Sequence, residues 1–332
     1  MRRSLPAGRG MAAPVRSPAE PVAPPSAHGA AEPPAGLLLV DKPAGVTSHD
    51  VVAAVRRAVR SRRVGHAGTL DPFATGLLVV AVGPVTRLLP WVVGEPKVYL
   101  ATIRFGAATD TDDGTGTVIR EAPVPAALAH DPSDDASVRR AMEALTGPLM
   151  QRPPAYSAKH VEGTRAYALA RRGALVELPP VPVTVHGWEV VGQDGPDLQV
   201  RITCGGGTYI RALARDLGEA VGSAAHCATL RRERSGPLSV EDAVPFAALA
   251  PGALAAGAIR LTSPLEALGA VAHEPLEAAQ VAAVRQGRMV PATQPGERAA
   301  LLDRGTVLAL AERRPGSWWQ PRVVLAGGPD GP

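Results

Sequence analysis

The chain has 332 residues, a formal net charge of +4 and a pI near 9.4. Hydrophobic residues make up 45% and aromatic residues only 3%, so there is enough apolar material for one large domain and a small one, while the charge favours an acidic partner such as nucleic acid only weakly. Two cysteines without a CxxC pair argue against a disulfide framework or a zinc site. With no apolar run of about 18 residues and no secretory signal, we expect a cytoplasmic protein without a membrane span.

The first part of the chain is predicted to contain a disordered extension followed by strands and helices. Residues 1–35 are rich in Pro, Ala and Gly and are expected to be disordered. An apolar run predicts a strand over 36–40, and Ser48 is expected to cap a helix in which Val recurs at helical spacing up to residue 59. A Gly-bearing loop over 64–76 leads to a buried strand over 77–82, an alternating strand follows over 97–106, and a helix is expected around 138–145.

The second part of the chain continues with a predicted strand and helix and ends in a smaller unit. An alternating strand over 198–204 stops at a run of three glycines, and Thr208 is expected to cap the next helix, with Arg211 and Arg215 on its polar face. These elements place the main domain at 36–250. An Ala/Pro/Gly-rich linker is expected at 251–264, and a small β-rich domain at 265–328 that contains one helix over 275–288.

The most specific segment is Gly65-His-Ala-Gly-Thr-Leu-Asp-Pro-Phe-Ala-Thr-Gly-Leu-Leu78. Proline at 72 biases Asp71 toward an extended backbone, and the glycines allow tight turns and close approach of another backbone. A carboxylate is therefore displayed on a constrained loop between a basic helix and a buried strand. By itself, an Asp before a Pro is most often only a turn.

This segment resembles the catalytic motif of the TruB family of tRNA pseudouridine-55 synthases, and the resemblance extends from about Leu37 to Leu238. It includes four further ordered blocks: LLVDKP from Leu38, RFGAATDTDD from Arg104, QRPPAYSA from Gln151, and GTYIRALARDLG from Gly207 with His226 and LRR from Leu230. The resemblance implies an α+β fold with a mixed, mainly antiparallel central sheet and flanking helices, plus a small PUA-like RNA-binding domain at the C-terminus. It also implies a tRNA-modifying isomerase that needs no cofactor and no metal.

The resemblance assigns roles to individual residues. Asp71 would be the catalytic carboxylate, while the freed base rotates and rejoins the sugar through C5. It would act as nucleophile at the sugar or at the base, or as a base in a glycal route, and the sequence does not choose among these routes. A carboxylate in a pocket that excludes water needs a neighbouring cation to stay charged, and Arg211 matches that position. Tyr99 would stack on the uracil and assist proton removal, although its place on the apolar face of a strand is also typical of a core tyrosine.

Four more residues match substrate-contacting or supporting positions. Tyr209 and Leu230 would contact uracil, and His66 would enter the RNA helix where the uridine leaves, offsetting part of the unstacking cost. Lys42 would brace the active-site loop or contact phosphate. The chain departs from the family pattern at Gly205–Gly206, where relatives often carry a Ser and a polar or basic residue, and at Lys159–His160.

Two further patterns invite other interpretations. The acidic run from Asp110 to Asp113 suggests a calcium loop, but position six is Thr115 rather than Gly and position five, Gly114, offers no oxygen ligand. The glycine run before Thr208 lacks the GK[ST] of a P-loop and the GxGxxG spacing. Neither a calcium site nor a nucleotide site is expected.

Three alternative functions stay open. A glycoside hydrolase could pair Asp71 with a carboxylate of the 110–113 run, although the shortage of aromatic residues argues against a sugar platform. A non-catalytic RNA-binding protein would explain the basic clusters at 56–63, 171–172 and 231–234 but not the Asp71 loop. Within the pseudouridine synthases, a guide-RNA-dependent, dyskerin-like enzyme is the second choice. The expected partner is the T-arm of tRNA, and the expected state is a monomer.

Overall fold

The computed structural model describes residues 34–92, 94–125, 136–156, 160–161, 164–165, 178–269 and 271–325. The predicted N-terminal extension falls almost entirely outside these ranges, as do Lys159, the basic pair at 171–172 and the last residues of the predicted C-terminal domain. Within the ranges, no helix is both long enough and apolar enough to cross a membrane.

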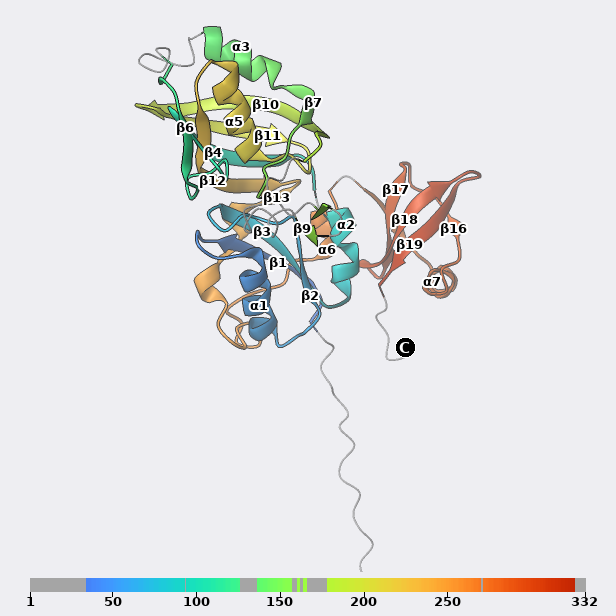
Figure 1. Ribbon diagram of the computed structural model, residues 1–332. Coiled ribbons are helices and arrows are strands. Elements are labelled where there is room, and N and C mark those ends of the chain that lie inside the picture. The colour runs from blue at the N-terminus through green and yellow to red at the C-terminus, as the bar shows by residue number, and fades with distance from the viewer. Residues whose placement is uncertain are drawn as a thin grey trace, which may run out of the picture. The chain divides into compact units, whose positions relative to one another are not determined.

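A ten-stranded mixed sheet forms the larger part of the fold (Figure 1). Its strands are β1 (Gly36–Lys42), β2 (Val64–Ala67), β3 (Thr75–Val82), β4 (Lys97–Phe105), β7 (Gly147–Gln151), β10 (Val181–Asp194), β11 (Asp197–Cys204), β12 (Ala225–Ser235), β13 (Leu238–Ser239) and β14 (Val244–Pro245). The order is β14-β1-β3-β12-β4-β11-β10-β7, with β2 on β3 and β13 on β12. Only the β1/β14 and β12/β3 pairs are parallel, which confirms the predicted mainly antiparallel sheet. The region predicted as a loop over 64–76 begins instead with strand β2.

Strands β1 and β3 are buried on both faces, which explains their continuous apolar sequences. Leu38 and Val40 pack into a core cluster with helix α1 (Ser48–Val59), whereas Leu37 and Leu39, which alternate with them, belong to a second cluster. The second cluster also contains apolar residues of the C-terminal sheet, such as Leu310. These strands therefore form a rigid support for the loop that lies between β2 and β3.

Helix α1 is capped one residue earlier than predicted. The Thr47 side chain accepts a hydrogen bond from Asp50 N, and the Asp50 carboxylate accepts one from Thr47 N, which makes a capping box. The Ser48 hydroxyl is buried and instead exchanges two 3.0 Å hydrogen bonds with the backbone of Leu70. Ser48, the residue predicted as the cap, thus connects the start of the helix to the loop that carries Asp71.

Helix α5 (Ile210–Ala220) also begins differently from the prediction, since Tyr209 occupies its N-cap position without a side-chain cap. Thr208 donates to Gly205 O instead. The amide of Gln151 clamps the backbone of Tyr209, accepting from its N at 2.9 Å and donating to its O at 3.0 Å. Helix α3 (Ala136–Ala144) lies where a helix was predicted, and both helices pack near one another beside the sheet (Figure 1).

The remaining elements outside the C-terminal sheet are short. They are β5 (Ala107–Thr109), β6 (Val118–Glu121), β8 (His160–Val161), β9 (Thr164–Arg165), α2 (Leu89–Val92), α6 (Pro264–Ala267), and 3-10 turns at Gly83–Leu88, Val240–Asp242 and Phe246–Ala248. The segment predicted as a linker over 251–264 packs on α1: Gly252 N donates to Arg57 O, and Ala253 and Ile259 are buried in the first core cluster.

The C-terminal part forms a five-stranded sheet, order β15-β17-β18-β19-β16. Its elements are β15 (Ala272–Pro275), α7 (Ala278–Arg285), β16 (Val290–Pro291), β17 (Arg298–Asp303), β18 (Thr306–Arg314) and β19 (Trp318–Val324). The helix predicted over 275–288 is shorter at both ends: Pro275 belongs to strand β15, which pairs with β17, Glu277 is the N-cap and Gln286 is the C-cap. The predicted small β-rich domain is confirmed as a strand-rich unit.

Glu274 should control the acid stability of this C-terminal sheet. It is 3% exposed, and burial alone would raise its pKa; the hydrogen bonds from Thr293, Gln294 and Trp319 outweigh that effect and hold the pKa below the ordinary 4.5. A lowered pKa gives stability that is present above pH 4.5 and is lost as the pH falls through the folded value. Glu274→Gln should lower the unfolding free energy by about 1–3 kcal/mol at pH 7. Urea unfolding at pH 7 and pH 3 should show this gap shrinking in acid; a constant gap would contradict the assignment.

Candidate active site

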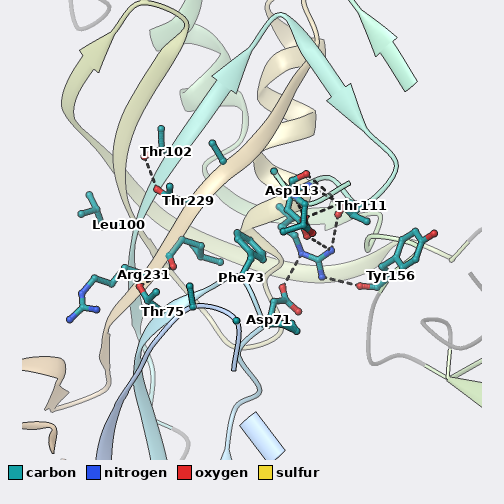
Figure 2. A pocket seen from close by; sticks show the side chains of 18 of the residues that line it. Asp71, Phe73, Thr75, Leu100, Thr102, Thr111, Asp113, Tyr156, Thr229 and Arg231 are labelled. Atoms are coloured by element: carbon teal, nitrogen blue, oxygen red, sulfur yellow. Dashed lines mark hydrogen bonds and ion pairs between the residues drawn. The ribbon is translucent and has the colours of Figure 1, made fainter. Parts of the chain in front are cut away.

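The loop between β2 and β3 borders a cavity of about 1290 Å³ (Figure 2). The lining residues used below are Asp71, Phe73, Thr75, Leu100, Thr102, Thr111, Asp113, Tyr156, Arg211, Thr229, Leu230 and Arg231. They come from the loop that carries Asp71 and the start of β3, from β4 and β12, from the 110–115 loop, from the 152–156 segment and from α5. We call this space the Asp71 cavity.

Asp71 lies at the turn of the loop with its side chain about one-third exposed (36%). The turn is closed by Ala74 N, which donates to Asp71 O at 3.1 Å, and the next residue is fixed by Gly45 N, which donates to Pro72 O at 2.8 Å. The carboxylate is therefore presented to the cavity from a backbone that is held on both sides.

Arg211 forms the central ion pair of the site. Its Nε lies 2.9 Å from Asp71 Oδ2, and the guanidinium is only 4% exposed. Nη1 donates to Thr111 O at 2.8 Å and Nη2 donates to Tyr156 O at 2.9 Å. Arg211 was expected to lie on the polar face of this helix. In the structure that face is directed into the protein, where the guanidinium pairs with Asp71.

Asp113 is the second carboxylate of this network. Its Oδ2 lies 3.5 Å from Arg211 Nη1, and its Oδ1 accepts hydrogen bonds from Thr111 Oγ1, Thr115 N and Thr115 Oγ1. With both oxygens engaged, Asp113 is 5% exposed. The acidic run is therefore a counter-charge for Arg211, and no group of three or more potential metal ligands occurs among the described residues.

A second ion pair lies four residues along α5. Arg215 Nη1 is 2.8 Å from Asp112 Oδ2, and Nη2 donates to Arg152 O at 2.9 Å. Burial raises the pKa of Asp112 in spite of the arginine beside it. Arg211 and Arg215 together hold the 152–156 backbone against α5, so the i, i+4 spacing read from the sequence places both arginines against one backbone segment.

Lys42 braces the Asp71 loop from behind. Its ammonium group donates to Pro43 O at 2.9 Å, Val46 O at 2.7 Å and Pro72 O at 3.3 Å, and the side chain is fully buried. Burial is the main cause that lowers its pKa from 10.5 to about 8; the charge of Asp71 opposes the shift and that of Arg232 adds to it. The predicted bracing contact is present, since Pro72 directly follows Asp71.

Lys42→Met should destabilise the protein by about 1–3 kcal/mol, because three carbonyl oxygens lose their donor. The lowered pKa means that the unfolded chain binds more protons between about pH 8 and 10.5, so this residue makes wild-type stability rise with pH across that window. Denaturant titrations of both proteins from pH 7 to 10.5 measure the difference. Equal pH slopes for the two proteins would show that Lys42 is not the titrating group.

Arg232 holds the other side of the loop. It is 1% exposed, and it donates to Leu77 O at 2.7 Å through Nε and to Gly68 O at 3.0 Å through Nη2. A Cβ at Gly76 would collide with the Arg232 backbone, and Gly76 has φ +97°. Glycine is thus required at the point where β12 meets β3 in parallel.

The structure brings together only some of the predicted site residues. Asp71, Arg211 and Leu230 line the cavity. Tyr99 lies on β4 with 7% of its surface exposed, outside the lining set, opposite Arg232 in the β12 pairing. Burial raises the pKa of its phenol.

Tyr209 and His66 also lie outside the cavity lining. The backbone of Tyr209 is fixed by Gln151 at the start of α5. His66 is on β2, edge-on to His49 with ring centroids 5.8 Å apart, and burial lowers its pKa. Both residues flank the loop and helix that carry Asp71 and Arg211.

Several site residues had no role assigned from the sequence. Phe73 and Arg231 line the cavity, Asp113 pairs with the Arg211 side chain, and Gln151 holds the backbone of Tyr209 at the start of α5. Gln151 and Asp113 lie in blocks already singled out by the resemblance, so their position near the site was foreseeable. Their partners were not, because the contacts join segments some 60 to 100 residues apart.

Comparison with known proteins identifies the family. A profile described as TruB family pseudouridylate synthase (N terminal domain) matches residues 56–210. The tRNA pseudouridine synthase B of Thermobifida fusca is 47% identical over 303 residues, covering 88% of this chain and 99% of that protein. The chain belongs to the TruB family. Its relative of the same name from Gloeobacter violaceus is 45% identical over 296 residues, 87% of this chain and 98% of that protein.

Solved structures share the TruB fold. The archaeal box H/ACA sRNP Nop10-Cbf5 complex contains a chain with TM-score 0.62 and 24% identity, covering 88% of this chain and 86% of that one. A Cbf5-Nop10-Gar1 complex gives TM-score 0.63 at 24% identity, covering 88% and 85%. At these identities the likeness shows the fold alone, and it confirms the predicted pseudouridine synthase fold.

Proposed function

We propose that this chain isomerises uridine-55 in the T-loop of tRNA to pseudouridine, with Asp71 as the nucleophile. The observation that carries the proposal is the ion pair between Asp71 and the buried Arg211 at the edge of the Asp71 cavity. The full-length match to relatives called tRNA pseudouridine synthase B supports the reaction and the substrate. A cytoplasmic monomer is part of the same proposal.

The reaction needs little more than one placed carboxylate. The uridine leaves the RNA stack, and the Asp71 carboxylate bonds to C1′ as the N1–C1′ bond breaks. The ring turns, C5 bonds to C1′ as the bond to Asp71 breaks, C5 loses its proton and N1 gains one. Arg211 holds the Asp71 carboxylate in its orientation through the base exchange, and the apolar side chains of Leu230 and Phe73 keep the detached ring in place.

The neighbouring residues act in support of this step. Tyr99 is the proposed stacking partner of the base, and Tyr209 contributes from the start of α5. His66 is proposed to fill the space that the uridine leaves in the RNA. Lys42 supports the loop through Pro72.

The deciding experiment uses purified protein and unmodified transcript tRNA, without any guide RNA, followed by mapping of pseudouridine along the whole tRNA. Product at position 55 alone is the expected result. Product only when a guide RNA is added would favour the dyskerin-like alternative, and tRNA binding without product would favour a pure binding protein.

A further inference from the structure

The Asp71 cavity is larger than one base requires. Its volume of about 1290 Å³ exceeds the roughly 300–1,000 Å³ of most small-molecule sites. Phe73 stands between two groups of lining residues (Figure 2). Asp71, Thr111, Asp113 and Tyr156 lie on one side, which we call the Asp71 half; Thr75, Leu100, Thr102, Thr229 and Arg231 lie on the other, which we call the Arg231 half.

The two halves differ in the polar groups that they present. Both carboxylates among the cavity-lining residues, Asp71 and Asp113, belong to the Asp71 half, and both are paired with Arg211. The Arg231 half presents a guanidinium and hydroxyl groups: Thr229 Oγ1 donates to Thr102 Oγ1 at 2.7 Å, and Thr75 begins β3 directly opposite Arg231 in the strand pairing. Such a surface suits a ligand with anionic oxygens.

Arg231 is held in position before any ligand arrives. Nη1 donates to Asp41 Oδ1 at 3.0 Å and Nη2 to Asp41 Oδ2 at 2.8 Å, so the carboxylate fixes the plane of the guanidinium. The side chain is 37% exposed. A guanidinium has five N–H donors, of which Asp41 takes two. Because the guanidinium is already held in one orientation, it loses little conformational entropy when it binds a ligand, and this favours recognition of phosphate.

We propose that the Arg231 half binds a backbone phosphate of the RNA strand next to the nucleotide that enters the Asp71 half, with Arg231 as the phosphate ligand and Asp41 as its positioning residue. The inference rests on the proposed function, since it takes RNA as the substrate. The proposal assigns RNA binding to the Arg231 half, which the chemistry at Asp71 alone would not need.

The test is the salt dependence of RNA binding. Full-length protein carrying Asp71→Asn, which prevents conversion during the measurement, is titrated with an unmodified T-arm hairpin from 50 to 200 mM salt, with and without Arg231→Gln. Loss of one phosphate contact should weaken binding at 50 mM salt and reduce the slope of log K against log salt by about one. Arg231→Lys should keep most of the slope, because it keeps the charge.

Arg104→Gln is the matched control. Arg104 forms the same kind of bidentate pair, with Asp197 at 2.7 and 2.6 Å, on the same sheet, but it does not line the cavity. Its slope should stay that of the parent protein. Equal slopes for parent and Arg231→Gln, or equal losses in Arg231→Gln and Arg104→Gln, would overturn the proposal. Pseudouridine formation by the wild-type protein is scored separately, so this inference can fail while the proposed function stands.

Discussion

Replacing Asp71 by Asn should lower the rate of pseudouridine formation by at least about 10⁴-fold, the scale seen when an enzyme loses its nucleophile. Asn has nearly the same shape, so the loop contacts of Ala74 N and Gly45 N are preserved, but the amide cannot attack and cannot form the ion pair with Arg211. Single-turnover assays with excess enzyme isolate this chemical step from RNA binding.

The control for that variant is Asp197→Asn, which removes one carboxylate from the same sheet at a site outside the cavity. It should turn over RNA at close to the wild-type rate. Asp71→Asn should also bind the T-arm hairpin within about tenfold of wild type. Residual turnover within tenfold of wild type in Asp71→Asn would remove Asp71 from the role of nucleophile.

Replacing Arg211 by Met should damage both stability and activity. Asp113 would be left as a buried carboxylate without its cation, a change that costs roughly 3–5 kcal/mol in unfolding free energy. Asp71 would lose the group that orients it, and a misplaced catalytic group costs about 10²-fold or more in rate. Denaturant unfolding and single-turnover rates measure the two effects independently.

The two effects of Arg211→Met can be separated by a second substitution. Adding Asp113→Asn removes the stranded charge while its oxygen still accepts from Thr111 and Thr115, so the double variant should regain most of the lost stability. It should not regain activity, because Asp71 still lacks its partner. Recovery of activity together with stability would mean that Arg211 acts only as a structural residue.

Sequence patterns were sufficient for the elements whose burial is regular. The apolar runs of β1 and β3 and the alternation in β4 and β11 predicted strands, since the residues on each face share one environment. Helix starts were less predictable, because the residue that caps depends on tertiary contacts. Ser48 has the right chemistry for a cap, but the loop at Leu70 takes its hydroxyl, and Thr47 caps instead.

The site itself was only partly within reach of the sequence. The resemblance pointed to Asp71 and Arg211, and the structure places them 2.9 Å apart. The acidic run from Asp110 was expected not to be a calcium loop, and its use as counter-charge for two arginines on α5 was not predicted, because it depends on how the loop folds over the helix. The bidentate Asp41–Arg231 pair joins residues 190 positions apart, and no local pattern indicates it.

The position of β12 in the sheet has a consequence for synthesis of the protein. Strands β3 and β4 follow one another in the chain, yet β12 lies between them and supplies Arg232, which holds both Gly68 and Leu77. A nascent chain that has left the ribosome only as far as β11 therefore has its Asp71 loop without the strand that closes the sheet around it. The loop can reach its final packing against Arg232 only after translation has passed Ser235.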